Sequence, residues 1–507
     1  MRKIPAIMST QHPDCASLPD FVKGDIFSND DEVAEAANAF KIGCDEQLWD
    51  WEGKEVDTHV VRKLLSADER FFRENALGKD VFITYRIPNP EVEGAERKLV
   101  VEALESIPRN FDVAKKFYGN CEPPIIEVAL PMTTSHEQML RVSSYYENVV
   151  VNKENMPVYG GIKLKEWIGE FNPKTVGVIP LIEDMQSILN TKGILGGFLA
   201  NKNAEYTRPW IARSDTALNY GLVPSTLLVK FFLSCVAASE AETGVPHYPI
   251  LATGAMPFRG GLNPDNVENF LEEYGAFKTY ALQSSAKYDF EREKVAKMID
   301  SLKKHSQHKA KEMGEDEKRG LLGIVEAFSG GYRKRVEGLA HVVNVVSGKV
   351  PNRRSRHLHI GLFGYSRNFS DSVKLPRAIK FAASLYSIGL PPEIIGISSL
   401  NAAESSGNKN GLDRLYVNLK GDLATVSGLV SKSAIKIACE KGLIGQETLD
   451  MVNEDIEAVE SFGIEIGAKT LEEEQHQLLA KQIVSNIGDG KVTDRITEAA
   501  KIRKSLG

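Results

Sequence analysis

The sequence predicts an α/β fold of the (β/α)8 TIM-type barrel class, with long helical insertions and an all-helical C-terminal extension. Short apolar runs alternate with longer helical patterns over the first 400 residues, as in a barrel of parallel strands. Polar and charged residues follow the runs, at the positions where such barrels carry their chemistry. A doubly wound open sheet stays as the alternative, because alternating elements do not fix the order of the strands.

Eight runs are short, apolar and bounded by Pro, Gly, Asn or Asp, which is typical of buried parallel strands. They span residues 4–10, 81–87, 125–130, 176–182, 210–213, 250–256, 357–363 and 393–398. Helical patterns lie between them, for example at residues 92–106, 137–148, 225–241 and 376–389. Each run is thereby followed by a segment that could return the chain to the start of the next strand.

Two further regions are helical by pattern and complete the predicted organisation. The catalytic barrel is expected over residues 1–400, with a charged helical insertion at about 283–345, and the extension over residues 401–507 is expected to pack on the barrel. The mixed-sign stretch 303–319 within the insertion is interpreted as a solvated helix face. Helical patterns in the extension span residues 413–419, 425–441, 447–462, 470–486 and 493–506.

Composition excludes several classes of protein. The chain has 507 residues, 42% of them hydrophobic, which is enough for a large core. With 62 basic and 69 acidic residues the net charge is −7, which argues against a general nucleic-acid binder. The five cysteines are scattered without a CxxC spacing, so neither a zinc site nor a disulfide framework is expected. We expect a soluble, cytoplasmic protein without a signal peptide or a membrane span.

The residues that follow the runs include one histidine, two acids and several arginines. His12 follows the first run, Arg86 the second, and Glu183, Asp215 and Arg259 follow the fourth, fifth and sixth. Any one of them could be a solvated loop residue, since loops are polar. As a set converging on one barrel mouth, they suit a divalent metal ion and a small anion with several charges.

Each residue type indicates a particular chemistry. The carboxylates of Glu183 and Asp215 suit Mg²⁺, with Mn²⁺ as a second possibility, because these ions prefer hard oxygen ligands. A general acid/base pair is the less favoured role, since nothing in the sequence separates their pKa values. Arg259 precedes two glycines and can bind a carboxylate or phosphate with two parallel hydrogen bonds. His12 suits a proton carrier, or else a structural residue bonded to nearby backbone. The residues alone predict a metal-assisted enzyme acting on a small phosphorylated or carboxylated anion.

Several of these segments resemble, in order, motifs of the phosphoenolpyruvate carboxylase family, and the whole chain is similar to its short archaeal type. The segments are MSTQHPD, VIPLIED, IARSDTALNYG, PFRGG and LPRAIKFAASLYSIGLPPEIIG, which resemble TAHPTE, PLFET, YSDSAKDAG, HGRGG and LRAIPWIFAWTQ. The resemblance implies a catalytic His12, metal ligands at Glu183 and Asp215, and phosphate contacts at Arg259 and Arg377. The segments ITYRIPNP and RRSRH suggest two more site arginines, Arg86 and Arg356.

The chain departs from the family pattern at two charged positions. The family lysine of SDSAKD falls on Leu218, and the neighbouring Arg213 is expected to supply that positive charge to the substrate. A second loop arginine has no counterpart after Arg259, and Arg367 is the candidate to replace it as a catalytic residue. The glycines after Arg259, or those around residues 330–331, are candidates for a mobile loop that excludes water.

The resemblance implies a homotetrameric enzyme that fixes carbon dioxide. It would carboxylate phosphoenolpyruvate irreversibly with bicarbonate, using Mg²⁺, to give oxaloacetate and phosphate through carboxyphosphate and pyruvate enolate. The small molecules phosphoenolpyruvate and bicarbonate are then the expected partners, and neither nucleic acid nor a membrane is expected. Two alternatives stay open. One is another metal-dependent barrel enzyme acting on pyruvate or enolpyruvate, a lyase or a transferase, and the other is a non-catalytic barrel that binds phosphorylated metabolites.

Overall fold

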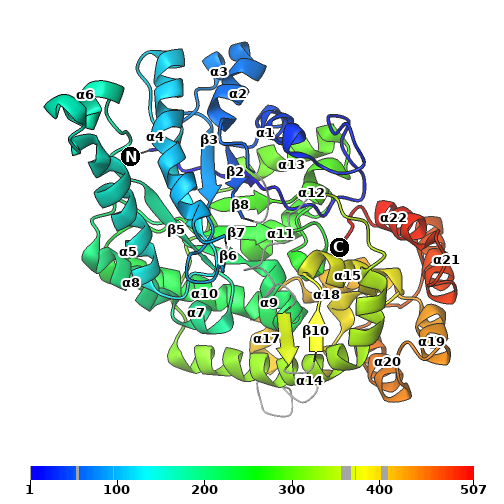
Figure 1. Cartoon of the computed structure of the whole chain (residues 1–507). Coiled ribbons are helices and arrows are strands. Elements are labelled where there is room, and N and C mark those ends of the chain that lie inside the picture. Colours follow the sequence, from blue (N-terminus) through cyan, green and yellow to red (C-terminus); the bar gives the residue numbers. More distant parts are fainter. Residues whose placement is uncertain (1, 53–55, 95, 355–366, 371–372, 401–408) are drawn as a thin grey trace.

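Eight parallel strands form a closed barrel in the order of the sequence. The computed structural model describes residues 2–52, 56–94, 96–354, 367–370, 373–400 and 409–507. Each barrel strand pairs with the next, and β8 pairs with β1, so that Ile7 lies opposite Tyr280. The sheet runs through the centre of the molecule with helices around it (Figure 1). The predicted barrel is therefore confirmed, and a doubly wound sheet is excluded because its edge strands would not pair with each other.

Six of the eight strands lie within predicted runs, and two were missed. The strands are β1 Ile7–Ser9, β2 Glu46–Asp50, β3 Phe82–Arg86, β4 Ile125–Leu130, β5 Gly177–Ile182, β6 Trp210–Ala212, β7 Ile250–Thr253 and β8 Thr279–Leu282. The missed strand β2 has the sequence EQLWD, in which three of five residues are polar. The missed strand β8 has only four residues, TYAL. Neither contains an apolar run, although every residue of both strands is buried in the barrel.

The predicted strand at residues 393–398 is wrong. This segment forms two short 3₁₀ turns, Pro392–Ile394 and Ile397–Ser399, whose isoleucines are buried among helices. Its apolar character reflects burial against helices, which the pattern of a short run does not distinguish from a strand. The predicted strand at residues 357–363 lies outside the described residues. The predicted domain boundary at residue 400 stays a prediction.

The inside of the barrel has an apolar half and an ionic half. Side chains from successive strands, including Leu48, Ile179 and Trp210, form a buried cluster within it. Towards the starts of the strands, Arg208 is fully buried between two carboxylates. Its Nη2 lies 2.7 Å from Glu46 Oε2, and its Nη1 donates to Glu127 Oε2 at 2.7 Å. This buried ionic group fills the barrel at the starts of the strands, so a functional site is expected at the other end.

The helices around the strands confirm the predicted helical patterns, with shifted ends. Those up to residue 304 are α1 Glu32–Lys41, α2 Val60–Ala67, α3 Glu69–Glu74, α4 Leu99–Tyr118, α5 His136–Tyr145, α6 Leu164–Ile168, α7 Met185–Leu189, α8 Thr191–Asn201, α9 Arg213–Tyr220, α10 Leu222–Thr243, α11 Val267–Tyr274, α12 Ser284–Tyr288 and α13 Arg292–Lys304. Helix α10 is long and apolar enough to cross a membrane, but 89% of its most apolar window is buried. It packs as a core helix against α8 and α9.

The insertion after β8 is helical, but its charged stretch is not one continuous helix. Residues 305–314 have no regular structure and separate α13 from the long helix α14 Glu315–Ser347. The solvated helix face predicted at residues 303–319 is therefore interrupted. Gly330 and Gly331 lie inside α14 and form no loop, and a Cβ at Gly331 would come within 1.9 Å of Ser399 Oγ. Gly331 therefore allows the turn Ile397–Ser399 to pack closely on α14, and the loop predicted around the two glycines is absent from this described part of the chain.

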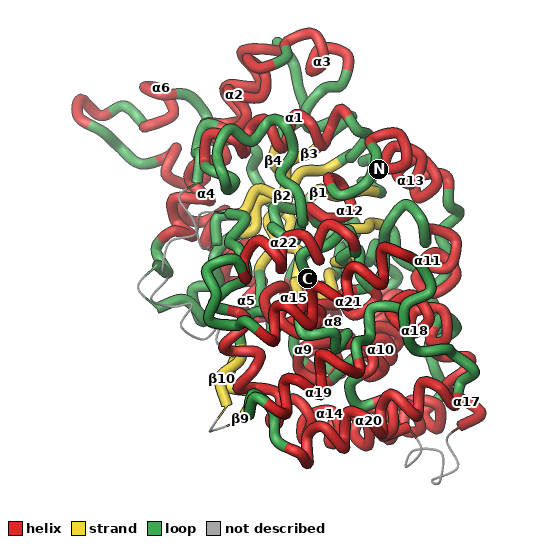
Figure 2. Tube along the Cα trace, turned by 90° about the vertical axis from the view of Figure 1, so that its right-hand side faces the viewer, coloured by secondary structure: helices red, strands yellow, loops and turns green. Residues whose placement is uncertain are grey.

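Helices that follow the barrel cover one end of it. They are α15 Ala378–Ser387, α17 Lys409–Leu415, α18 Leu419–Ser427, α19 Lys432–Glu440, α20 Gln446–Ser461, α21 Leu471–Ser485 and α22 Val492–Ile502. Two short strands, β9 Arg367–Ser370 and β10 Val373–Leu375, pair antiparallel before α15. Helix α15 contacts α9, α14, α21 and α22, and Figure 2 shows it beside α22 near the end of the chain. It is thus held between a barrel helix and the helical extension.

One segment projects away from the barrel. Residues 146–174, which we call the arm, connect α5 to β5 and include α6, which stands out at the upper left of Figure 1. The arm exposes large apolar side chains: Met156 is 56% exposed, Trp167 69%, and Tyr159 is fully exposed. Such a cluster is unusual on the surface of a monomer.

Candidate active site

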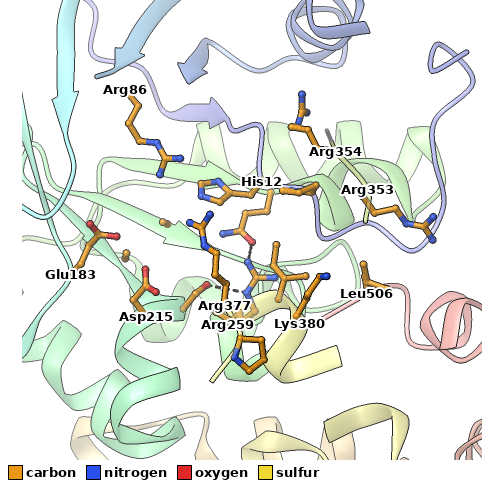
Figure 3. A pocket seen from close by; sticks show the side chains of 18 of the residues that line it. His12, Arg86, Glu183, Asp215, Arg259, Arg353, Arg354, Arg377, Lys380 and Leu506 are labelled. Atoms are coloured by element: carbon orange, nitrogen blue, oxygen red, sulfur yellow. Dashed lines mark hydrogen bonds between the residues drawn. The ribbon is translucent and has the colours of Figure 1, made fainter. Parts of the chain in front are cut away.

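A cavity of about 430 Å³ opens where the strands of the barrel end. Side chains that follow β1, β3, β5, β6, β7 and β8 line it, and the start of α15, residues 351–354 and Leu506 close it from the other side (Figure 3). The strand-end residues are His12, Arg86, Glu183, Ser214, Asp215, Arg259 and Gln283. Six residues predicted from the sequence thus meet in this cavity: five strand-end residues and Arg377 from α15.

Glu183 and Asp215 lie together on one side of the cavity (Figure 3). Glu183 directly follows β5, is 8% exposed, and accepts a hydrogen bond from the Met132 amide at 2.7 Å through Oε2. Asp215 lies in the first turn of α9, where the helix dipole favours a negative charge. No cluster of three or more metal-ligating side chains occurs among the described residues. Two carboxylates fit Mg²⁺, which usually retains waters and binds substrate oxygens in its remaining positions.

Arg259 is anchored on all sides although it lines the cavity. It ends the 3₁₀ turn Pro257–Arg259 after β7 and is 2% exposed. Its Nε donates to Ser214 Oγ at 3.0 Å, and its Nη2 donates to Gln283 Oε1. The next residue, Gly260, has a φ of +119°, and a Cβ there would lie 2.2 Å from Thr253 Oγ1. The PFRGG sequence therefore forms a tight turn that fixes the arginine, and the mobile loop expected after it stays a prediction.

Asp14 is the acidic partner of Arg259, and the sequence analysis did not assign it a role. Its Oδ2 lies 3.2 Å from Arg259 Nη1, and its carboxylate also accepts hydrogen bonds from Ser284 and Ser285. Burial lowers the pKa of Arg259, and the nearby Asp14 carboxylate opposes that shift. The sequence signal was present, because Asp14 belongs to the same MSTQHPD segment as His12.

Arg86 is the second cavity arginine with acidic partners. It ends β3, and its Nε and Nη2 donate to the two carboxylate oxygens of Asp50 at 2.9 and 2.6 Å. Glu52 Oε2 lies 3.2 Å from the same Nη2. Asp50 ends β2 and Glu52 follows it, so these partners were missed together with that strand.

Residues outside the barrel contribute more positive charge to the cavity. Arg377 caps the start of α15, and Lys380 lies one turn further along that helix. Arg353 and Arg354 also line the cavity, and Arg354 is paired with Glu32 and Glu35. Of these four residues, the sequence analysis identified only Arg377. A lysine or arginine in a loop or helix carries no signal that it faces a barrel mouth.

Three predicted site residues are not brought to the cavity by the described part of the structure. Arg213 is fully buried behind it, where its Nη2 donates to Thr226 Oγ1 at 2.8 Å and its Nε to Tyr274 Oη at 3.3 Å. Its expected contact with substrate is therefore not supported, because the helix that starts there turns the side chain into the core. Arg356 lies outside the described residues. Arg367 begins β9, and its side chain is also outside what the structure describes.

His12 lines the cavity between these groups. It follows β1 and is half-buried, and its carbonyl accepts hydrogen bonds from the amides of Asp14 at 3.2 Å and Ser284 at 3.3 Å. These contacts fix the backbone beside the imidazole. In Figure 3 the ring lies over the centre of the cavity, near Arg86 and Arg377. The geometry is compatible with proton transfer to or from a bound anion.

The chain is similar to several known proteins. The chain is 43% identical over 511 residues to a phosphoenolpyruvate carboxylase of Metallosphaera sedula, with full coverage of both chains. It is 46% identical over 422 residues to one of Methanothermobacter thermautotrophicus, covering 83% of this chain and 86% of that one. A solved HpcH/HpaI aldolase from Desulfitobacterium hafniense is 14% identical, with a TM-score of 0.33 over 59% of this chain and 93% of that chain. A family model described as phosphoenolpyruvate carboxylase matches residues 4–507, so this chain belongs to the archaeal-type phosphoenolpyruvate carboxylase family.

Proposed function

We propose that this protein carboxylates phosphoenolpyruvate with bicarbonate, giving oxaloacetate and phosphate. The observation that carries the proposal is the meeting of His12, Glu183, Asp215, Arg259 and Arg377 in one cavity at the end of the barrel strands. The resemblance to the family's motifs implies catalytic, metal-binding or phosphate-binding roles for these five residues. The net reaction needs a small trianionic substrate and a monoanion side by side, which suits a cavity with several cations.

The residues of the chain have separate roles in the proposed reaction. A bicarbonate oxygen attacks phosphorus, the ester P–O bond breaks, and carboxyphosphate and pyruvate enolate form. Arg259 and Arg377 hold the phosphoryl oxygens in place during this transfer, which depends mostly on positioning and charge. His12 then accepts the carboxyphosphate proton as its C–O bond breaks, and the enolate carbon attacks the CO₂ that is released.

A divalent cation fits the acidic side of the cavity. Glu183 and Asp215 would hold Mg²⁺, or Mn²⁺ in its place, leaving positions for water and substrate oxygens. Such an ion, when bound, would stabilise the negative charge that develops on the enolate oxygen. The apolar side chains of Leu181, Trp210 and Leu506 also line the cavity, and they would limit the access of water that would protonate the enolate to pyruvate.

The direct test is the formation of oxaloacetate by the purified protein. Phosphoenolpyruvate, bicarbonate and Mg²⁺ are supplied, oxaloacetate is measured with malate dehydrogenase, and phosphate is measured in parallel. We expect both products in equal amounts and neither without bicarbonate. Phosphate or pyruvate released independently of bicarbonate would instead indicate another metal-dependent enzyme acting on enolpyruvate.

The metal site is tested by binding as well as by turnover. Glu183→Gln and Asp215→Asn replace a hard carboxylate with a poor amide ligand, so Mn²⁺ titration followed by electron paramagnetic resonance should show weaker binding in each. Asp184→Asn is the matched control, because that carboxylate caps α7 through the Ser187 amide at 3.0 Å and does not line the cavity. Equal Mn²⁺ affinity in the parent, Glu183→Gln and Asp215→Asn proteins would contradict this site.

Homotetrameric assembly and a cytoplasmic location belong to the same proposal. The exposed apolar side chains of the arm support an interface between copies, because burying them would remove apolar surface from water. Trp167→Glu should lower the molar mass found by light scattering after gel filtration. Leu471→Glu, at a 79% exposed leucine away from the arm, is the control that should leave the mass unchanged. A single chain mass for the parent protein would contradict the assembly.

A further inference from the structure

Most cations of the cavity already have partners within the protein. Arg86, Arg259 and Arg354 each form an ion pair with a buried carboxylate. Arg353 donates to the carbonyl oxygens of Cys15 and Ala16. A buried cation that is paired in this way is held in one position, and much of its charge is offset before any ligand binds.

Lys380 differs from these arginines. It lines the cavity from α15, is half-buried, and its Nζ has no hydrogen bond or ion pair with any of the described residues. Burial lowers the pKa of this lysine, and no carboxylate opposes the shift. An ammonium group that is partly removed from water without a partner is costly, and a bound anion would remove that cost. The side chain is therefore arranged for a ligand that none of the described residues supplies.

The position of Lys380 indicates which part of the cavity it serves. In Figure 3 it lies on the side away from Glu183 and Asp215, next to Leu506. Helix α15, which carries Lys380, packs against α9 and against the C-terminal helices α21 and α22. These contacts fix the position of the backbone from which the side chain extends. The cavity thus has an acidic side suited to a cation and an opposite side with an ammonium group that has no partner in the described part of the chain.

We propose that Lys380 binds an oxyanion of the substrates at the side of the cavity opposite Glu183 and Asp215. The family's lysine falls on Leu218 in this chain, and Lys380 brings a positive charge to the cavity from another element, α15. Leu218 is fully buried in the core and Arg213 points away from the cavity, so neither can serve. This inference rests on the proposed function, and the oxyanion is a phosphoryl or carboxylate group of phosphoenolpyruvate, or bicarbonate.

Steady-state kinetics distinguish the two sources of the oxyanion. Lys380→Met removes the charge at nearly the same length, and Lys380→Arg retains a cation. We expect the methionine variant to raise the KM for phosphoenolpyruvate or for bicarbonate by about ten- to a hundredfold, since hydrogen bonds to charged groups are strong. The substrate whose KM rises is the one bound, and the arginine variant should recover part of the loss. Lys374→Met, at an exposed lysine of β10, is the matched control and should match the parent.

A binding measurement on the unmodified protein tests the site independently of catalysis and of any folding defect. Brief acylation with an acetylating reagent, followed by mass spectrometry, measures the labelling rate of Lys380 relative to Lys374. Phosphoenolpyruvate, bicarbonate or inorganic phosphate should slow the labelling of Lys380 several-fold and leave Lys374 unchanged. Equal labelling of Lys380 with and without these anions, or unchanged KM values for both substrates in Lys380→Met, would overturn the inference. A protein that forms no oxaloacetate but shows this protection would contradict the proposed function and support the oxyanion site.

Discussion

At the scale of single residues, the cavity contains two classes of charged group that differ in what holds them. Arg86 and Arg259 are fixed by acids of the protein, and their geometry exists before any ligand binds. Lys380 has no such partner among the described residues. Preorganised groups can stabilise a charge that develops during reaction without reorganising, whereas an unpaired group contributes more to binding. Replacing Arg86 or Arg259 should therefore disturb a geometry that exists before binding, whereas replacing Lys380 should mainly weaken the binding of an anion.

Replacing His12 by asparagine should separate the two halves of the proposed reaction. Asparagine keeps a similar size but cannot accept the carboxyphosphate proton, so attack on phosphorus should survive while CO₂ release fails. Carboxyphosphate would then be hydrolysed and the enolate protonated. We expect bicarbonate-dependent release of phosphate and pyruvate with almost no oxaloacetate, measured with lactate and malate dehydrogenase in parallel. An unchanged ratio of oxaloacetate to phosphate would end the assignment of His12 as the proton acceptor.

Replacing Arg259 by lysine should lower kcat/KM by much more than tenfold. The charge is kept, but a lysine cannot contact Ser214, Gln283 and Asp14 together while facing the phosphoryl group. We expect the same direction for Arg377→Lys. Arg70→Lys, at an arginine whose side chain is 90% exposed, is the control. Parent-like kinetics in Arg259→Lys would show that the fork of hydrogen bonds is not used in catalysis.

At the scale of elements, the ion pairs inside the barrel and the residues that line the cavity lie at opposite ends of the same strands. The starts of the strands hold the buried group of Arg208, Glu46 and Glu127, and the ends of the same strands hold the cavity. Helix α15 carries both Arg377 and Lys380, so one braced helix sets the position of two cavity cations. A substitution at the starts of the strands should therefore change the stability of the fold more than the structure of the cavity.

The ion cluster inside the barrel predicts a large loss of stability in Arg208→Met. Removing the arginine leaves two carboxylates buried without their partner, which typically costs about 3–5 kcal/mol in the free energy of unfolding. Urea unfolding followed by circular dichroism measures this difference. Arg70→Met breaks an exposed pair with Glu74 and should change the free energy by no more than about 1 kcal/mol. Similar values for the two variants would show that the buried cluster contributes no more than a surface pair.

At the scale of the whole molecule, the C-terminal helices are connected to the cavity by a chain of buried contacts. His476 on α21 lies 3.3 Å from Arg503, whose Nη2 donates to the Leu506 carbonyl at 2.7 Å. Leu506 lines the cavity, and its amide donates to the Asp14 carbonyl at 2.7 Å. The extension therefore forms part of the cavity wall.

This contact chain predicts a dependence of stability on pH. Burial, together with the nearby Arg503, lowers the pKa of His476 to about 3. Between pH 6.5 and 3 the unfolded chain binds a proton at this residue and the folded chain does not, so stability is complete above pH 6.5 and falls as the pH is lowered. In His476→Gln, which can still accept from Arg503, the loss of unfolding free energy between pH 7.5 and 5 should shrink by about 2 kcal/mol. An unchanged pH dependence in urea unfolding would contradict the buried neutral state of His476.

Much of this protein could be predicted from local sequence. The alternation of strands and helices depends on neighbouring residues, and six of eight barrel strands were located in this way. His12, Glu183, Asp215 and Arg259 were found because each lies in the segment after a strand, and the ends of parallel strands meet at one place. The side chains of these four residues meet because the closed barrel brings the ends of its strands together.

Only the tertiary structure decided which distant groups are paired. Asp14 and Arg259 are 245 residues apart, Lys380 reaches the cavity from α15, and Leu506 reaches it from the segment after α22. The strands β2 and β8 were missed, and residues 393–398 were assigned to a strand, because burial by distant segments can overrule the local pattern. Arg213 shows the same effect, since one turn of α9 directs it into the core and Asp215 into the cavity. The local sequence determines periodicity, whereas a side chain's partner depends on packing between segments that are far apart in the chain.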